Sequence, residues 1–162
     1  EIYKLASLKK LSLDKFNSQA EKIFEVKKDY HYDQYFYSLL RNKNKRQIYE
    51  FYYQIESKES SINDLAKEHS SGSEKAKLGI IGPINLVNIN PEIAKILKSS
   101  KDSIINDPIE INNEWFLIQR EKFISAIYSE YYENQICMEL LEREFEIEYK
   151  NEYLNLINKL NF

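Results

Sequence analysis

The sequence predicts an α+β protein in which helical ends flank a small four-stranded mixed sheet. Residues 60–123 contain all three glycines and all three prolines of the 162-residue chain. Glycine adopts backbone angles that other residues avoid, and proline fixes φ and lacks an amide donor, so the chain turns repeatedly there. The rest of the chain lacks both residues and can form long helices. This division is typical of an α+β fold with a separate helical part.

The two ends of the chain have helical patterns of apolar residues. Residues 2–11 and 13–28 are predicted to form two helices, the second capped by Ser12 or Asp14. Residues 124–160 are predicted to be helical throughout, with a bend or break because of their length. The single cysteine, Cys137, is expected to be a buried apolar residue. The apolar stripes comprise Ile2, Leu5, Leu8 and Leu11; Phe16, Ala20, Ile23 and Phe24; Ile124, Ile127, Tyr128 and Tyr131; and Leu141, Phe145, Tyr149, Leu156 and Leu160.

Strand and helix patterns alternate in the middle of the chain. The aromatic stretch 32–41 has the length and composition of a strand, and an amphipathic helix follows at 45–57. Ser60 or Ser61 can cap a short helix that runs to residue 68.

The second half of this region adds the remaining strands. Residues 78–82 form a short strand that Pro83 should end, and Pro91 is well placed to begin a helix over 91–98. Two strand-like runs then follow, joined by the pair Asn112-Asn113, which tolerates the positive φ of a hairpin turn.

Charge and hydropathy exclude several functional classes. A net charge of −3 argues against general nucleic-acid binding. No apolar run approaches the roughly 18 residues that cross a bilayer, so we expect no stable membrane insertion, and no signal-peptide pattern is visible. Residues 1–58 carry twelve Lys/Arg against eight acids, whereas 130–152 carry eight glutamates against two bases. These are either two solvated helix faces or ends that attract each other or a second copy.

The order of elements, with the phrases LAKEHS, LGIIG, Asn-Leu-Val and QREKF, resembles parvulin-type peptidyl-prolyl isomerase domains over residues 32–123. The helical flanks are similar to those of the SurA-type chaperones and PpiC-like isomerases of bacteria, including shorter cyanobacterial relatives. The resemblance implies one helical chaperone lobe from residues 1–30 and 124–162, beside a parvulin domain at 31–123. It also implies unfolded or extended polypeptide clients, no cofactor, and the periplasm or cell envelope ahead of the cytoplasm.

Parvulins isomerise the bond before proline, whose uncatalysed barrier is about 18–20 kcal/mol. The family twists this bond in an apolar pocket beside two histidines and a cysteine or aspartate. Alignment of the strand motifs places Ser38 and Phe116 at the histidine positions, and Gly72 at the cysteine or aspartate position. We therefore expect no catalytic residue and a degenerate active site. The pocket phenylalanine of the family has no counterpart, because no aromatic residue occurs between positions 54 and 114.

The two histidines, His31 and His69, do not align with the family's histidine positions. They are too few for a three-histidine metal site, so we expect surface residues and no metal. The basic connector 41–46 lies where some eukaryotic parvulins hold a phosphate-reading loop, and we expect it to be a solvated loop. Its charged residues are Arg41, Lys43, Lys45 and Arg46.

Four apolar residues could form a concave sheet face that accepts an extended or proline-containing segment, or could simply fill the domain core. They are Leu40, Leu86, Phe116 and Ile118. Two functions follow from the resemblance: a SurA-like chaperone whose isomerase domain is inactive or very weak, or a genuine but weak isomerase that relies on pocket shape and desolvation. A third possibility is a homodimer formed by helix exchange.

Overall fold

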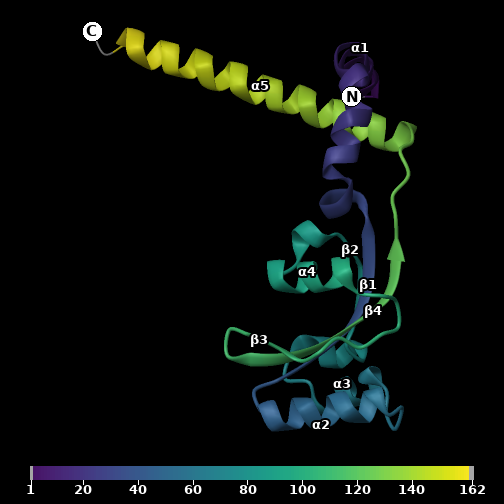
Figure 1. Ribbon diagram of the computed structural model, residues 1–162. Helices are drawn as coiled ribbons and strands as arrows, with labels where there is room; N and C mark the ends of the chain where they lie inside the picture. The colour runs from purple at the N-terminus through teal and green to yellow at the C-terminus, as the bar shows by residue number, and fades with distance from the viewer. Residues whose placement is uncertain (1, 161–162) are drawn as a thin grey trace. The chain divides into compact units, whose positions relative to one another are not determined.

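The computed structural model describes residues 2–160, and side chains are described for residues 3–155. Ile2, Leu156 and Leu160, which the sequence places on apolar stripes, lie outside the described side chains. The chain divides into two compact units (Figure 1). Unit 1 comprises Glu1–Lys28 and Ile127–Phe162, and unit 2 comprises Asp29–Ala126.

Unit 2 contains the predicted four-stranded sheet, so the α+β class is confirmed. The strand order is β2-β1-β4-β3, and all three pairings are antiparallel rather than mixed. Asn112 and Asn113, with φ values of 53° and 63°, form the hairpin turn that makes β3 antiparallel to β4. The strands are β1 (Gln34–Asn42), β2 (Ile80–Ile84), β3 (Ile109–Ile111) and β4 (Glu114–Ile124).

The helices of unit 2 begin at side-chain caps. Ser61 accepts a hydrogen bond from the Asp64 amide and thereby confirms the predicted cap of α3 (Ile62–His69). Asn90 caps α4 (Pro91–Ser99), whose first residue is the predicted proline. The remaining helical segments are α2 (Lys45–Glu56), the π-helical turn η1 (Lys28–Tyr32), and the short 3-10 helices η2 (Ser73–Lys77) and η3 (Leu86–Asn88).

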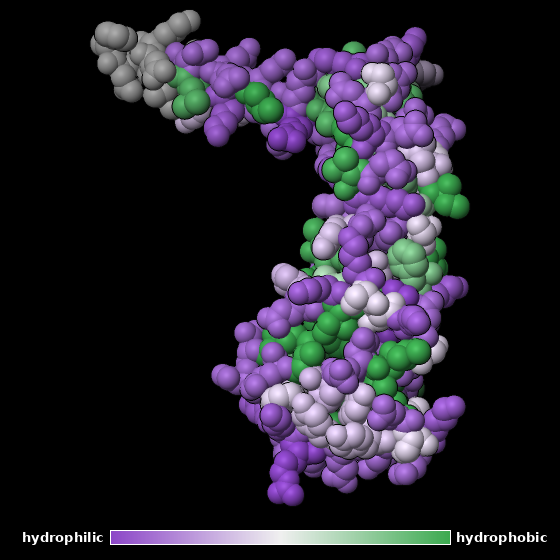
Figure 2. All heavy atoms as spheres, viewed as in Figure 1, coloured by the Kyte–Doolittle hydropathy of each residue, from purple (hydrophilic) through white to green (hydrophobic). Residues whose placement is uncertain are grey.

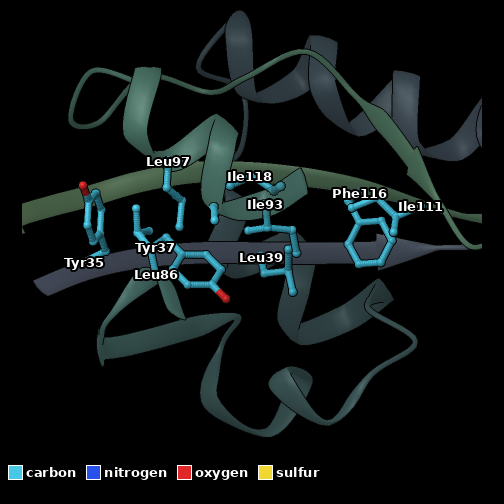
Figure 3. Packing of buried hydrophobic residues seen from close by; sticks show 10 residues of the cluster. Tyr35, Tyr37, Leu39, Leu86, Ile93, Leu97, Ile111, Phe116 and Ile118 are labelled. Atoms are coloured by element: carbon cyan, nitrogen blue, oxygen red, sulfur yellow. The ribbon is translucent and has the colours of Figure 1, made fainter. Parts of the chain in front are cut away.

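Two apolar cores cover the two faces of the sheet, because successive strand residues point to opposite faces. The first core lies between the sheet and α4, and Figure 3 shows its side chains along β1 and β4. It comprises Tyr35, Tyr37, Leu39, Leu86, Ile93, Ala94, Leu97, Ile111, Phe116 and Ile118. The second core packs α2 and α3 against the other face and comprises Leu40, Ile48, Phe51, Ile62, Leu65, Ala66 and Leu117.

Unit 1 consists of α1 (Ile2–Lys27) and α5 (Glu130–Leu160). The prediction of two N-terminal helices is wrong, since α1 continues through Ser12. The hydroxyl of that buried serine donates to the Lys9 carbonyl inside the helix instead of capping a new one. The C-terminal helix begins six residues later than predicted, because β4 continues to Ile124 and residues 125–129 are not helical. It then runs to Leu160 without the expected break.

The contact between α1 and α5 combines aromatic packing with ion pairs. The ring of Phe24 lies 5.4 Å from Tyr128 and 5.0 Å from Tyr132, measured between centroids. Lys27 lies 2.7 Å from Glu139, and a second pair joins Lys15 to Glu144. The burial of Cys137 is confirmed, whereas Ile127 and Tyr131, predicted to be on an apolar stripe, are 82% and 71% exposed.

Hydropathy along the described helices gives no segment long and apolar enough to cross a bilayer.

We predict that Ile48→Ala lowers the free energy of unfolding of unit 2 by about 2–5 kcal/mol, since it leaves a cavity in the second core. The matched control is Ile104→Ala, because Ile104 is 55% exposed whereas Ile48 is fully buried. Urea unfolding of both variants checks this prediction. Equal losses of stability in the two variants would contradict the placement of Ile48 in a core.

Candidate functional site

A cavity of about 880 Å³ opens on the first-core face of the sheet, between β1, β3, β4, β2 and α4. Figure 2 shows hydrophobic residues grouped on the visible face of unit 2 among hydrophilic ones. The apolar lining comprises Leu39, Ile80, Ile81, Ile93, Ile111 and Phe116. The polar lining comprises Arg41, Ser73, Glu74, Lys77, Asn90, Asn112 and Glu114. The cavity can therefore hold an apolar group while it offers polar atoms at its margin.

The four residues predicted to bind peptide do not share one surface. Phe116 lines the cavity, whereas Leu86 and Ile118 are only 2% and 1% exposed and form the core beneath it. Leu40 lies in the second core on the opposite face of the sheet, so its assignment to this face is wrong. The physical reason is the two-residue period of a strand: Leu39, not Leu40, shares a face with Phe116.

Ser38 also points to the face of the sheet opposite the cavity, because it lies one residue before Leu39 on the strand. Its hydroxyl accepts a hydrogen bond of 2.8 Å from the Asn63 amide, and Asn63 belongs to α3 on the second-core face. Four residues of β1 instead point toward the first core or its cavity, namely Tyr35, Tyr37, Leu39 and Arg41.

Gly72 lies immediately before η2, and the space that a side chain would need there is filled. A Cβ atom at Gly72 would lie 2.0 Å from Nε of Arg41 and 2.2 Å from a carboxylate oxygen of Glu74. The ion pair between Arg41 and Glu74 therefore occupies the place next to the position aligned with the family's cysteine or aspartate.

This ion pair is bidentate and largely buried on its acidic side. Nε and Nη2 of Arg41 donate to the two carboxylate oxygens of Glu74 at 3.0 and 2.9 Å. The hydroxyl of Ser70 also donates to Glu74. The side chain of Glu74 is 4% exposed and that of Arg41 is 31% exposed, so solvent reaches the arginine but hardly reaches the carboxylate. The sequence did not indicate this pair, because residues 41–46 have the composition of a solvated basic connector.

Burial and the Arg41–Glu74 ion pair shift the pKa values of Glu74 and of the neighbouring Tyr37. Burial favours a raised pKa for Glu74, but the hydrogen bonds from Arg41, Ser70 and the backbone lower its pKa below the ordinary value. Burial, and secondarily the Glu74 carboxylate, raises the pKa of Tyr37 to about 12. Near neutral pH Glu74 is therefore an anion and Tyr37 a neutral phenol. Neither has the pKa near 7 that suits proton transfer.

Neither histidine lines the cavity. His69 stacks on Phe51 of the second core, with a centroid distance of 4.7 Å, and His31 is exposed beside Tyr32. In the described part of the chain, no group of three or more His, Cys, Asp or Glu side chains is arranged to hold a metal ion.

The basic connector does not converge on the cavity either. Lys45 lies 4.6 Å from the Trp115 ring centroid and 5.8 Å from that of Tyr49, where its charge makes cation–π contacts. Only Arg41 of the four basic residues lines the cavity, and two of its nitrogens bind Glu74. Arg41 belongs to β1, as the strand predicted over 32–41 has it, so its second assignment to the connector 41–46 is wrong.

The fold and sequence define an isomerase-type domain. A family model described as "Rotamase: PPIC-type PPIASE domain" matches residues 34–122, which is more than half of the chain. The chain therefore belongs to the PPIC-type, or parvulin, peptidyl-prolyl isomerase family. A search of curated proteins gives no match.

Several solved structures share the fold at low sequence identity. Peptidylprolyl isomerase PrsA from Bacillus anthracis is 20% identical with a TM-score of 0.60, and the match covers 79% of this chain and 60% of that one. Foldase protein PrsA from Streptococcus pneumoniae is 15% identical with a TM-score of 0.55, covering 83% and 52%. A chain from the work on PEB4 and the periplasmic protein Cj1289, two SurA-like chaperones of Campylobacter jejuni, is 15% identical with a TM-score of 0.57, covering 96% and 69%. The chain thus spans about three fifths or less of the length of these PrsA proteins.

We predict that Glu74→Gln lowers the free energy of unfolding at pH 7 by about 1–3 kcal/mol, because the variant loses a charged hydrogen-bonded pair. The folded pKa of Glu74 lies below its unfolded value, so its contribution is present above the unfolded pKa of about 4.3 and disappears as pH falls through the folded pKa. The stability difference between wild type and variant should therefore vanish in acid. Denaturant unfolding at several pH values from 7 to 2.5 measures it.

The exposed carboxylate Glu59 supplies the control, and Glu59→Gln should change stability by less than about 0.5 kcal/mol at pH 7. A Glu74→Gln difference that stays constant with pH would contradict a stabilising carboxylate.

Proposed function

We propose that this chain is a SurA-like chaperone or peptide-binding protein whose parvulin domain holds extended polypeptide segments and has little or no isomerase activity. The observation that supports the proposal is the cavity: six apolar side chains line it, and neither histidine does. The resemblance aligns Phe116 with a family histidine and Gly72 with the family's cysteine or aspartate, and the Arg41–Glu74 ion pair lies beside Gly72. An apolar cavity binds a side chain through burial alone, which needs no titrating group.

Isomerisation requires interactions that favour the twisted amide over the planar one. Phe116 offers no hydrogen bond, and Gly72 has no side chain. The alternative is a genuine but weak isomerase in which desolvation of the amide inside the cavity supplies the rate enhancement. The two functions predict the same binding site and differ only in turnover.

Clients and compartment belong to this proposal as well. The fold is shared with the PrsA foldases and with proteins described as SurA-like chaperones, one of them called periplasmic. We infer unfolded or extended polypeptides as clients and the periplasm or cell envelope as the compartment, ahead of the cytoplasm.

We predict that Ile80→Asn weakens binding of a short Xaa-Leu-Pro peptide by about tenfold, since a buried apolar contact is worth roughly 1.5–3 kcal/mol. Ile80 lines the cavity and is 46% exposed, so this variant should fold. Fluorescence anisotropy of a labelled peptide measures binding, and a protease-coupled assay on the same sequence measures isomerisation.

Ile104→Asn is the matched control, because Ile104 is exposed and does not line the cavity. A rate above background that Ile80→Asn and Phe116→Leu both abolish would favour the weak isomerase. The absence of any peptide binding to the wild type would overturn both functions.

The uncovered ends of α1 and α5 support an additional role in self-association. The first third of α1 exposes Tyr3, Leu5, Leu8 and Leu11 together with lysines, and the distal part of α5 exposes Phe145, Ile147, Tyr149, Tyr153 and Leu154 together with glutamates. Lys15–Glu144 and Lys27–Glu139 already join the two helices by opposite charges within the chain. We infer that a second copy covers these ends by exchange of helices, since domain swapping is a low-cost route to dimers.

We predict a dimer at low salt that weakens as salt rises, because screening shortens the reach of the charge pairs to about 3 Å at 1 M ionic strength. Light scattering should give twice the 19.4 kDa chain mass at low salt. Tyr149→Ser should shift the equilibrium to monomer, whereas Tyr53→Ser, an exposed tyrosine of unit 2, should not. A monomer at every salt concentration would remove this role.

A further inference from the structure

One guanidinium nitrogen of Arg41, Nη1, carries two N–H groups that do not bind Glu74. Its Nε and Nη2 atoms donate to Glu74, which fixes the plane of the guanidinium. Nη1 lies 3.8 Å from a carboxylate oxygen of Glu114, which is too far for a hydrogen bond. Among the described side chains, the hydrogen bonds of the Arg41 guanidinium both go to Glu74 and use Nε and Nη2. Arg41 and Glu114 both line the cavity, and the Arg41 side chain is 31% exposed, which leaves Nη1 for a ligand there.

The charges around this donor cancel. Arg41 and Lys77 are the cations of the cavity wall, and Glu74 and Glu114 are its anions. An anionic ligand therefore gains no net attraction from the wall. A carboxylate bound to Nη1 would also lie close to Glu114, and two like charges a few ångströms apart repel each other. A neutral acceptor avoids this repulsion.

The acceptor that every extended polypeptide carries is the main-chain carbonyl. A segment whose apolar side chain enters the cavity beside Ile80 and Phe116 brings its own backbone to the polar margin. The N–H groups of one fixed guanidinium nitrogen at that margin would set the position of the backbone along the cavity.

We propose that Arg41 binds a main-chain carbonyl oxygen of the client through Nη1, and that Glu114 makes the site select electrically neutral segments against acidic or phosphorylated ones. Arg41 is thus a ligand-binding residue held in place by Glu74, and Glu114 is a specificity-determining residue. This inference rests on the proposed peptide-binding function and adds the chemical class of the bound segment.

The test uses the full chain and two capped peptides, Ala-Ala-Leu-Pro-Phe-Ala and the same sequence with glutamate in place of the alanine before leucine. Wild type should bind the neutral peptide about tenfold more tightly than the acidic one. Glu114→Gln should raise affinity for the acidic peptide and leave affinity for the neutral peptide within twofold. If Glu114 had only a structural role, Glu114→Gln would change the affinities for the two peptides by the same factor.

Arg41 is tested with the paired variant Arg41→Met/Glu74→Gln, because Arg41→Met alone would leave the buried Glu74 carboxylate without its partner. Glu74→Gln is the reference for folding, and thermal unfolding verifies both variants. The paired variant should bind the neutral peptide about tenfold more weakly than Glu74→Gln does, because it lacks one hydrogen bond from a charged group to the peptide. Lys101→Met, which removes an exposed cation that does not line the cavity, should stay within twofold of wild type.

Equal binding of both peptides by wild type and by Glu114→Gln would overturn the selection against acidic segments. Binding of the neutral peptide that does not change in the paired variant would overturn the role of Arg41. Tighter binding of the acidic peptide would show that Arg41 takes a carboxylate instead. Binding of neither peptide would overturn the proposed function itself, so the two failures can be distinguished.

Discussion

The antiparallel pairing of β1 with β4 is the constraint on which unit 2 depends. These two strands are the inner strands of the sheet, and their register places Leu39 opposite Ile118 and Arg41 opposite Phe116. Because side chains alternate along a strand, this register decides which residues enter each core. It also decides that Phe116 and the Arg41–Glu74 pair lie at the same cavity. The helices cover the two faces that this pairing creates.

The positions of the elements could be predicted because local chemistry marks their ends. Ser61 caps α3, Pro91 begins α4, and the asparagine pair turns the chain between β3 and β4. Which residues of β1 point to which face of the sheet could not be predicted in the same way. Both faces of this strand are buried, so the run from Tyr35 to Leu40 is apolar almost throughout and lacks the alternation that would show its register. The sequence pattern therefore could not show whether Ser38, or instead Tyr37 and Leu39, point toward the cavity.

The sequence predicts only those residues of the candidate site whose position depends on the order of the strands. Phe116 lies on β4 and reaches the cavity as the resemblance implies, whereas the ion pair joins residues 33 positions apart. Arg41 is preceded by leucines and followed by a polar connector, so its neighbours in sequence gave no reason to expect a buried partner. Glu74 lies in the five-residue 3-10 helix η2, which is too short for a sequence pattern to indicate whether a side chain points in or out. Pairings of this kind are set by the folded chain alone.

Gly72 connects the missing chemistry to this ion pair. A side chain at residue 72 and the guanidinium of Arg41 compete for one volume, since the two would be 2.0 Å apart. A side chain at residue 72 would require the guanidinium of Arg41 and the carboxylate of Glu74 to shift, and both groups are the ends of flexible side chains. The glycine is therefore packed against an arrangement in which Arg41 and Ser70 hold the Glu74 carboxylate, whose side chain is 4% exposed. Because a catalytic side chain at residue 72 would have to share its space with this ion pair, the glycine and the ion pair are linked by packing.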